Sequence, residues 1–96
     1  MADFVLSPEA RADLISIWRY SADRWNEEQA DHYLRKIDGV FATIARRPSL
    51  GRPCDDIRSG YFRIKAGSHV VFFKTAGTDV FIVRVLHQSQ DFIRHL

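Results

Sequence analysis

The sequence contains only one cysteine, one methionine and three prolines among its 96 residues. A lone cysteine, Cys54, cannot form an internal disulfide, which argues against a disulfide-stabilised secreted domain and favours a reducing cytoplasm. No stretch approaches the roughly 18 consecutive apolar residues of a membrane span. The first residues also lack the basic and apolar regions of a signal peptide. We therefore expect a cytoplasmic protein that is neither secreted nor inserted in a membrane.

A strong excess of one charge is also missing, because the formal net charge is only +2. The distribution is nevertheless uneven. Residues 1–45 carry a net charge of −3, residues 46–74 carry +5, and the remainder is neutral. The small overall excess does not identify a nucleic-acid-binding protein, and we expect no direct nucleic-acid binding by the chain alone. Two surfaces of opposite charge could bind different partners.

The length and the hydrophobic content of 46% are sufficient for one compact domain, residues 1–96, and too small for two. A chain of this size buries only about 60–65% of its unfolded surface. A permanent partner would therefore add stability.

Two amphipathic helices are predicted in the first half. A short apolar run at residues 4–6 stops at Ser7 and Pro8, where serine can cap a helix and proline suits its first turn. Asn26 can cap a second helix, which should end before Pro48. Since only about two residues link the helices, we expect an antiparallel helical hairpin.

The second half is typical of an antiparallel meander. Residues 61–66, 69–75 and 78–86 are rich in aromatic and β-branched side chains and are separated by short turns that contain glycine. The breaker-rich stretch 48–60 is predicted to be a surface loop. Ser89 can cap a short terminal helix. The predicted fold is α+β, with a short N-terminal strand and the helical hairpin packed on a three- to four-stranded antiparallel sheet, followed by a short C-terminal helix or tail.

Several short motifs are distributed over nearly the whole chain. They are Leu6-Ser7-Pro8-Glu9-Ala10 followed by Asp13-Leu14, the helix from Ala30 to Ile44, Arg47-Pro48 with Gly51-Arg52, and Arg84-Val85-Leu86-His87 with Asp91. In this order and spacing they resemble ParE-like toxins of the RelE/ParE superfamily. The resemblance implies a toxin of a type II toxin–antitoxin system, bound and neutralised by a ParD-like antitoxin in a hetero-oligomer.

The two branches of this superfamily harm the cell in different ways. RelE-like toxins cleave ribosome-bound messenger RNA, whereas the ParE branch is associated with DNA gyrase. In RelE-like enzymes an arginine faces the phosphate near the start of the second meander strand, and the resemblance puts Val70 at that position. Loss of one transition-state donor typically costs about 100- to 1000-fold in rate. The sequence therefore favours a gyrase inhibitor that acts by binding, without catalytic residues.

Two alternatives to gyrase inhibition remain open at this point. His87 matches a histidine of some RNA-cleaving relatives, and together with Arg63, Lys65 and Arg84 it could form a residual site of a ribosome-dependent mRNA endoribonuclease. ParE-like chains share this histidine, so it does not discriminate. The other alternative is a toxin-like regulatory protein that does not arrest growth.

The resemblance implies that the C-terminal segment contacts the target. The candidate target-binding residues are Arg84, His87, Gln90, Asp91, Phe92 and Arg94. The candidate antitoxin-binding residues are Tyr20, Trp25, Arg46, Arg47, Arg52, Arg63 and Lys65. For several of them a structural role is the alternative. An arginine amid apolar residues needs hydrogen-bonded partners, so Arg84 is equally a candidate to pair with Asp91 or another carboxylate.

No cofactor or metal site is predicted. Asp55 and Asp56 are adjacent acidic residues that no further ligand cluster joins in sequence. Cys54 has no base beside it, so we do not expect a nucleophile there. Trp18 and Tyr33 fall on apolar helical stripes, which favours core positions over base stacking.

Overall fold

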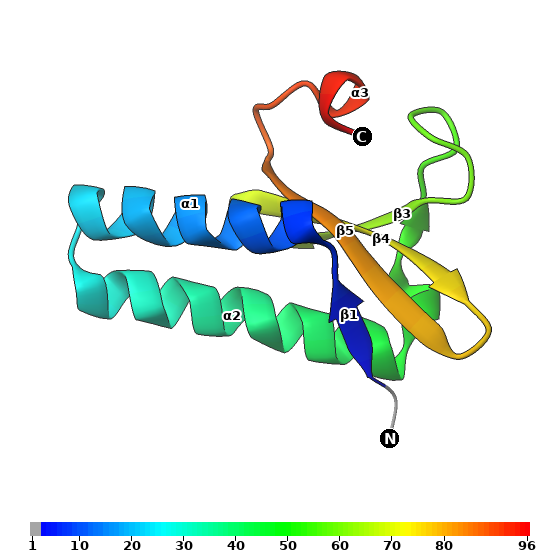
Figure 1. Ribbon diagram of the computed structural model, residues 1–96, viewed down its shortest axis with the longest axis horizontal. Helices are drawn as coiled ribbons and strands as arrows, with labels where there is room; N and C mark the ends of the chain where they lie inside the picture. Colours follow the sequence, from blue (N-terminus) through cyan, green and yellow to red (C-terminus); the bar gives the residue numbers. More distant parts are fainter. Residues whose placement is uncertain (1–2) are drawn as a thin grey trace.

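Two long helices cover one face of a five-stranded sheet in the computed structural model, which describes residues 3–96 (Figure 1). This arrangement confirms the predicted α+β class. The elements in chain order are β1 (Phe4–Leu6), α1 (Pro8–Arg24), α2 (Glu27–Arg46), the 3-10 turn η1 (Pro48–Leu50), β2 (Arg52–Pro53), β3 (Phe62–Ala66), β4 (His69–Ala76), β5 (Asp79–His87) and α3 (Phe92–His95).

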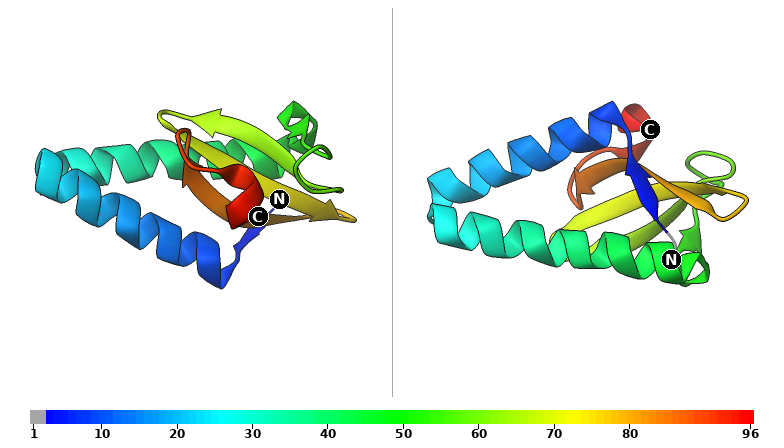
Figure 2. Two further views of the ribbon diagram at one scale, coloured as in Figure 1. Left: turned by 90° about the horizontal axis from the view of Figure 1, so that it is seen from above. Right: turned by 60° about the horizontal axis from the view of Figure 1, so that its bottom comes forward.

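Both helix starts are capped as the sequence predicts. The Ser7 hydroxyl accepts a hydrogen bond from the Ala10 amide at 2.9 Å, and Asn26 Oδ1 accepts one from the Gln29 amide at 2.8 Å. The caps supply partners for amides that have none inside the helix. Figure 2 shows that α1 and α2 lie close together at their linking turn and diverge toward their other ends. Within residues 3–96, no helix combines the length and the apolar character needed to cross a bilayer.

The sheet has more strands than predicted, and its strands are not all antiparallel. Its order is β1-β5-β4-β3-β2, in which β1 runs parallel to β5 and the other pairs are antiparallel. The expectation of a three- to four-stranded antiparallel sheet is therefore corrected in these two details. β1 lies at one edge. The fifth strand, β2, has only two residues, Arg52 and Pro53, and lies inside the predicted loop, where so short a segment leaves no periodicity to read.

Each face of the sheet has its own core. The largest cluster of buried side chains lies under the helices. It includes Ile37, Phe41, Ile44, Val71, Phe73, Val80 and Ile82. On the other face, Cys54, Phe72 and Leu86 are buried beneath the C-terminal segment and the loop before β3. β5 is thereby covered on both faces. Figure 2 shows α3, in red, against the end of β5 and away from the turn between the helices.

Two glycines occupy places that a larger residue cannot fill. A Cβ built on Gly51 would lie 2.3 Å from Phe73 Cζ, so the chain after η1 passes directly over a buried ring. Gly67, in the turn between β3 and β4, has a φ of +63°, which L side chains rarely adopt. These glycines fix where the chain leaves α2 and where the first hairpin turns.

Candidate functional site

The C-terminal segment is tied to the body of the protein by Arg84, on β5. Its Nε and Nη2 each donate to the carboxylate of Asp13 on α1, both at 2.8 Å. Its Nη1 donates to the carbonyl oxygen of His95 in α3 at 2.9 Å. The carboxylate of Asp13 also accepts the backbone amide of Val85 at 2.9 Å. One ion pair thus joins α1, β5 and α3.

This pairing explains the arginine among apolar residues. The hydrogen bond that Arg84 donates to Asp13 raises the pKa of Arg84 above its usual value. The sequence left open whether Arg84 pairs with Asp91 or with another carboxylate, and its partner is Asp13. Asp91 Oδ1 instead accepts the Ile93 amide at 3.1 Å and caps α3. Ser89, expected to be the cap, instead hydrogen-bonds to His87. The guanidinium of Arg84 is therefore occupied inside the fold and positions the C-terminal segment.

The remaining candidate target-binding residues differ in exposure. Phe92 is half-buried, with its ring 4.9 Å from that of Phe72 in an edge-on arrangement. Gln90 and Arg94 are exposed, although Gln90 Oε1 accepts the His87 amide at 2.7 Å. Sequence reasoning did not single out Ile93, whose side chain is 71% exposed on α3. The segment thus turns Phe92 inward and presents Ile93 and Arg94 to solvent.

His87 belongs to a cluster on the helix side of the sheet. Its ring lies 5.2 Å from that of His69, whose Nδ1 is 2.6 Å from the Tyr33 hydroxyl. Burial, and secondarily His87, lowers the pKa of His69 to about 4, so this ring is neutral near pH 7. The Tyr33 hydroxyl also accepts the Ser68 amide at 3.0 Å, and it lies 3.4 Å from the Ala66 carbonyl oxygen, a second acceptor for its proton.

Two adjoining cavities open beside this histidine pair, and both are lined by Tyr20, His69 and His87. Their volumes are about 380 and about 230 Å³. Tyr20 is 64% exposed, and Trp25, which lines the second cavity, is 60% exposed. Large exposed aromatic side chains beside a cavity are typical anchor points for a protein partner.

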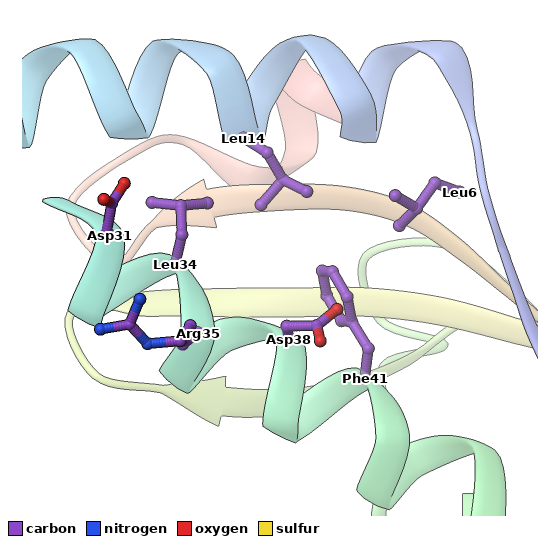
Figure 3. A pocket seen from close by; sticks show the side chains of 7 residues that line it. All are labelled: Leu6, Leu14, Asp31, Leu34, Arg35, Asp38 and Phe41. Atoms are coloured by element: carbon purple, nitrogen blue, oxygen red, sulfur yellow. The ribbon is translucent and has the colours of Figure 1, made fainter.

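A third cleft, of about 370 Å³, lies between α1 and α2 (Figure 3). Leu14 of α1 and Leu34 of α2 point into it, with Leu6 and Phe41 at its β1 end. Charged side chains of α2, among them Arg35 and Asp38, line its rim. An apolar floor with a charged rim suits the amphipathic face of a partner helix.

The opposite face of the sheet carries a basic groove of about 240 Å³. It brings together three of the candidate antitoxin-binding residues, Arg52, Arg63 and Lys65. Val70 and Phe92 are among its apolar lining residues. Arg46 and Arg47 are exposed at the end of α2 and are not among the residues lining this groove. In the part of the chain that the structure describes, the ion pair between Arg84 and Asp13 is the only one, so the three groove cations have no acidic partner.

The four residues of the residual ribonuclease site do not converge. Arg63 and Lys65 line the basic groove, whereas His87 lines the cavity beside Ile17 under the helices. Arg84 is engaged by Asp13. A general base and a phosphate-binding cation must reach the same reacting group. The sheet separates the histidine from the two cations, and Val70 adds no charge to the groove.

The candidate nucleophile and metal ligands do not form a reactive centre either. Cys54 is fully buried, contrary to a surface loop position, and burial raises the pKa of its thiol. A buried thiol in apolar surroundings is a poor nucleophile. Across residues 3–96, no group of three or more His, Cys, Asp or Glu side chains is placed to hold a metal ion.

Asp13 is the residue that the site depends on and that the sequence reading did not single out. A signal was present, because Ala10, Asp13, Leu14 and Ile17 follow the spacing of one buried helical stripe. A carboxylate on such a stripe requires an internal partner. Trp18, predicted to be in the core, is half-buried and donates its indole N–H to Asp31 at 2.8 Å.

The helical hairpin on a mixed sheet places the protein in the RelE/ParE fold class. The chromosomal ParDE toxin–antitoxin system from P. aeruginosa contains a similar chain, with a TM-score of 0.80 at 17% identity, covering 91% of this chain and 96% of that one. A chain of the M. tuberculosis toxin–antitoxin complex RelBE2 gives 0.70 at 20% identity, covering 91% and 98%.

Sequence similarity is more specific than the fold. Residues 4–92 match the family described as the ParE toxin of the type II toxin–antitoxin system parDE. Toxin ParE1 of Caulobacter vibrioides is 46% identical over 96 residues, which cover all of this chain and 99% of that protein. The chain therefore belongs to the ParE toxin family of type II toxin–antitoxin systems.

Proposed function

We propose that this toxin stops growth by binding DNA gyrase through its C-terminal segment, residues 84–96, without catalysis. Phe92 and Leu96 pack on the second core and hold α3 in place. Arg84 donates to the His95 carbonyl, and Arg58 donates to that of Leu96 at 2.9 Å. The exposed Ile93 and Arg94 then form a small, rigidly held contact surface, which lowers the entropic cost of binding.

The observation that carries the proposal is the separation of the chemical groups needed for RNA cleavage. Val70 provides no cation in the groove, and His87 lies on the other face of the sheet from Arg63 and Lys65. A toxin with this arrangement has surfaces that could bind another protein, but no general base is among the residues that line its basic groove.

Neutralisation is assigned to a ParD-like antitoxin. Its amphipathic helix would dock in the cleft of Leu14 and Leu34, with Tyr20 and Trp25 as further anchors at the other end of the hairpin. Residues 46–74 carry a net charge of +5, which would attract an acidic antitoxin and speed association.

Regulated expression in bacteria, with and without the cognate antitoxin, tests the proposal. We expect growth arrest with DNA-damage signalling and intact transcripts, relieved by the antitoxin. Arrest with cleaved messenger RNA would reverse the assignment, and absence of arrest would indicate a regulatory protein. As a matched pair of variants, Ile93→Ala and Ile15→Ala remove exposed isoleucines from α3 and α1, and only the former should weaken toxicity.

A ribosome-dependent ribonuclease of the RelE type is the second candidate. The observation in its favour is the groove of Arg52, Arg63 and Lys65, whose cations are suited to phosphate contacts. On this alternative, purified toxin would cleave messenger RNA on ribosomes, and Arg63→Gln would abolish the cleavage.

A further inference from the structure

Two histidines face each other across β4 and β5 on the helix side of the sheet. His69 and His87 are directly paired in the strand register, and their rings lie 5.2 Å apart in an edge-on arrangement. Both rings line both of the adjoining cavities beside Tyr20, whose volumes are about 380 and about 230 Å³. Neither ring has a role in the target contact proposed for Ile93 and Arg94.

The Nδ1 atom of each ring is hydrogen-bonded within the fold. His87 Nδ1 accepts the Ser89 amide at 3.1 Å and lies 2.7 Å from the Ser89 hydroxyl. A neutral His87 ring therefore carries its proton on Nε2. His69 Nδ1 lies 2.6 Å from the Tyr33 hydroxyl, which can supply the proton of that hydrogen bond. Nε2 is thus the free polar atom that each histidine offers to the cavities.

The charge around the cavities favours an anionic ligand. None of the described residues that line them is acidic, and Arg24 lines the smaller one. The acidic group that acts on His69 is Asp13, whose charge is balanced by Arg84. Two N–H groups on neighbouring rings match the two oxygens of a carboxylate, and the Ser16 hydroxyl is a further donor at the larger cavity.

The remaining lining residues suit a flat apolar body. Ile17, only 7% exposed, contributes an apolar surface to the larger cavity. Tyr20 lines both cavities, and Trp25 and Tyr33 line the smaller one. Ligand sites are typically concave and mostly apolar, with a few polar groups that fix the orientation of the ligand. An aromatic ring on the ligand would pack favourably against these aromatic side chains.

We propose that the two cavities form a binding site for a small aromatic carboxylate. Its carboxylate accepts hydrogen bonds from Nε2 of both histidines, and its ring lies against Ile17 and Tyr20. The bound carboxylate selects the tautomer of His69 that has the proton on Nε2, so the Tyr33 hydroxyl then donates to Nδ1. This site lies on the other face of the sheet from the basic groove and is additional to the proposed contacts with gyrase and the antitoxin.

Ligand binding should be coupled to protonation of His69. Burial, and then the charge of His87, lowers the pKa of His69 to about 4 in the free protein. A carboxylate beside the ring stabilises its charged form and should raise this pKa toward the ordinary 6.5. The complex then binds more protons than the free protein, so affinity should increase as the pH falls from about 8 to about 5.5. The charges of Asp13 and Arg24 act with and without the ligand and therefore do not cause the change.

The test is an NMR titration of the purified toxin, without its antitoxin, with indole-3-acetate as the probe. We expect saturable shifts of the imidazole Cε1–H signals of His69 and His87, and a higher pKa of His69 in the complex. Indole-3-acetamide has the same shape but no charge. It should bind about tenfold more weakly, because charge-assisted hydrogen bonds are roughly twice as strong as neutral ones. Acetate provides the carboxylate without the ring and should also bind more weakly.

Two pairs of variants locate the site. Ser16→Tyr fills the larger cavity from an exposed position of α1 and should abolish binding. Ala12→Tyr adds the same side chain at another exposed position of α1, which does not line either cavity, and should leave Kd unchanged. His87→Phe keeps a ring but removes its N–H donor, and should raise Kd about tenfold. Its control is His32→Phe, at an exposed position of α2.

The first pair remains informative if the loss of His87 destabilises the fold, because Ser16 and Ala12 are exposed. Equal affinity for indole-3-acetate and its amide, equal weakening by both tyrosine variants, or no shift of either histidine would overturn the inference. A short peptide ending in tryptophan presents the same ring and carboxylate on a polypeptide. Tighter binding of this peptide than of indole-3-acetate would identify a protein terminus as the ligand and would also overturn the inference. None of these results depends on whether the toxin inhibits gyrase.

Discussion

Asp13 and Arg84 form a two-point ion pair, with both hydrogen bonds at 2.8 Å and side chains that are only 14% and 20% exposed. The two residues are 71 positions apart in the chain. The pair connects the first helix to the last long strand, and the third nitrogen of the guanidinium continues to the His95 carbonyl. This carboxylate therefore helps to fix the position of α3, and with it the proposed target surface, together with the packing of Phe92 and Leu96.

Asp13→Asn should therefore destabilise the protein by about 2–3 kcal/mol, because it leaves a half-buried guanidinium without its counter-ion. Urea unfolding measures the loss, and hydrogen exchange should show that residues 92–96 open first. The matched control is Asp31→Asn, which alters the exposed contact to Trp18 and should cost less than about 1 kcal/mol. Equal costs for the two variants would contradict the role given to Asp13.

His69 should make stability dependent on pH. Its pKa is lowered from 6.5 to about 4 in the fold, chiefly by burial and then by His87, while Asp13 acts in the opposite direction. The unfolded chain therefore binds a proton first as pH falls. Stability should decrease from about pH 6.5 down to about pH 4, by roughly 1–2 kcal/mol after allowance for partial exposure.

Thermal unfolding between pH 7 and pH 4.5 measures this dependence. His69→Gln should flatten the pH profile, whereas His32→Gln, at an exposed position on α2, should keep the wild-type slope. If the stability of the His69→Gln variant depends on pH as steeply as that of the wild type, a group other than His69 causes the dependence.

Replacement of glycine by alanine should have opposite effects on stability at Gly51 and at Gly39. Gly51→Ala would place a methyl group 2.3 Å from the buried Phe73 ring and should cost about 1–3 kcal/mol. Gly39→Ala, inside α2 with nothing within 4 Å, should stabilise the protein by up to about 1 kcal/mol. Denaturant midpoints of the two variants check both signs. A neutral Gly51→Ala would mean that the segment after α2 can move away from Phe73.

Association with the antitoxin should depend on the basic stretch at the end of α2. Replacing Arg46, Arg47 and Arg52 with Glu reverses three charges and should slow association by about tenfold or more in dilute salt, with a smaller effect at high salt. Stopped-flow or surface-based kinetics with the purified antitoxin measure the rate. An unchanged association rate would show that these three arginines do not attract the antitoxin electrostatically.

The structural features that depend only on neighbouring residues can be predicted from the sequence. Ser7 and Asn26 predict the two helix starts. Apolar residues alternate in residues 61–66, and three of them, Phe62, Ile64 and Ala66, lie under the helices as that period requires. The parallel pairing of β1 with β5 was not predicted, because it joins residues 4–6 to residues 80–82 and no local pattern records it. β2 was missed because two residues cannot display a period.

The candidate site was predictable only in part, for the same reason. The pattern around Arg84 indicated that the guanidinium needs a partner, but the choice between Asp91 and a distant carboxylate is made by the packing of α1 on β5. His87 and the cations of β3 were considered together on the basis of residue type. Only the register of the strands shows that they lie on opposite faces.

The central claim is that the toxin acts by binding through its C-terminal segment. The most direct measurement is DNA gyrase supercoiling in vitro with wild-type toxin and with the Ile93→Ala, Arg94→Gln double variant, while ribosome-bound messenger RNA is checked for cleavage in parallel. We predict inhibition by the wild type, at least about tenfold weaker inhibition by the folded double variant, and intact RNA in both cases. Specific RNA cleavage by the wild type with Val70 in place, and unaffected gyrase, would contradict the account.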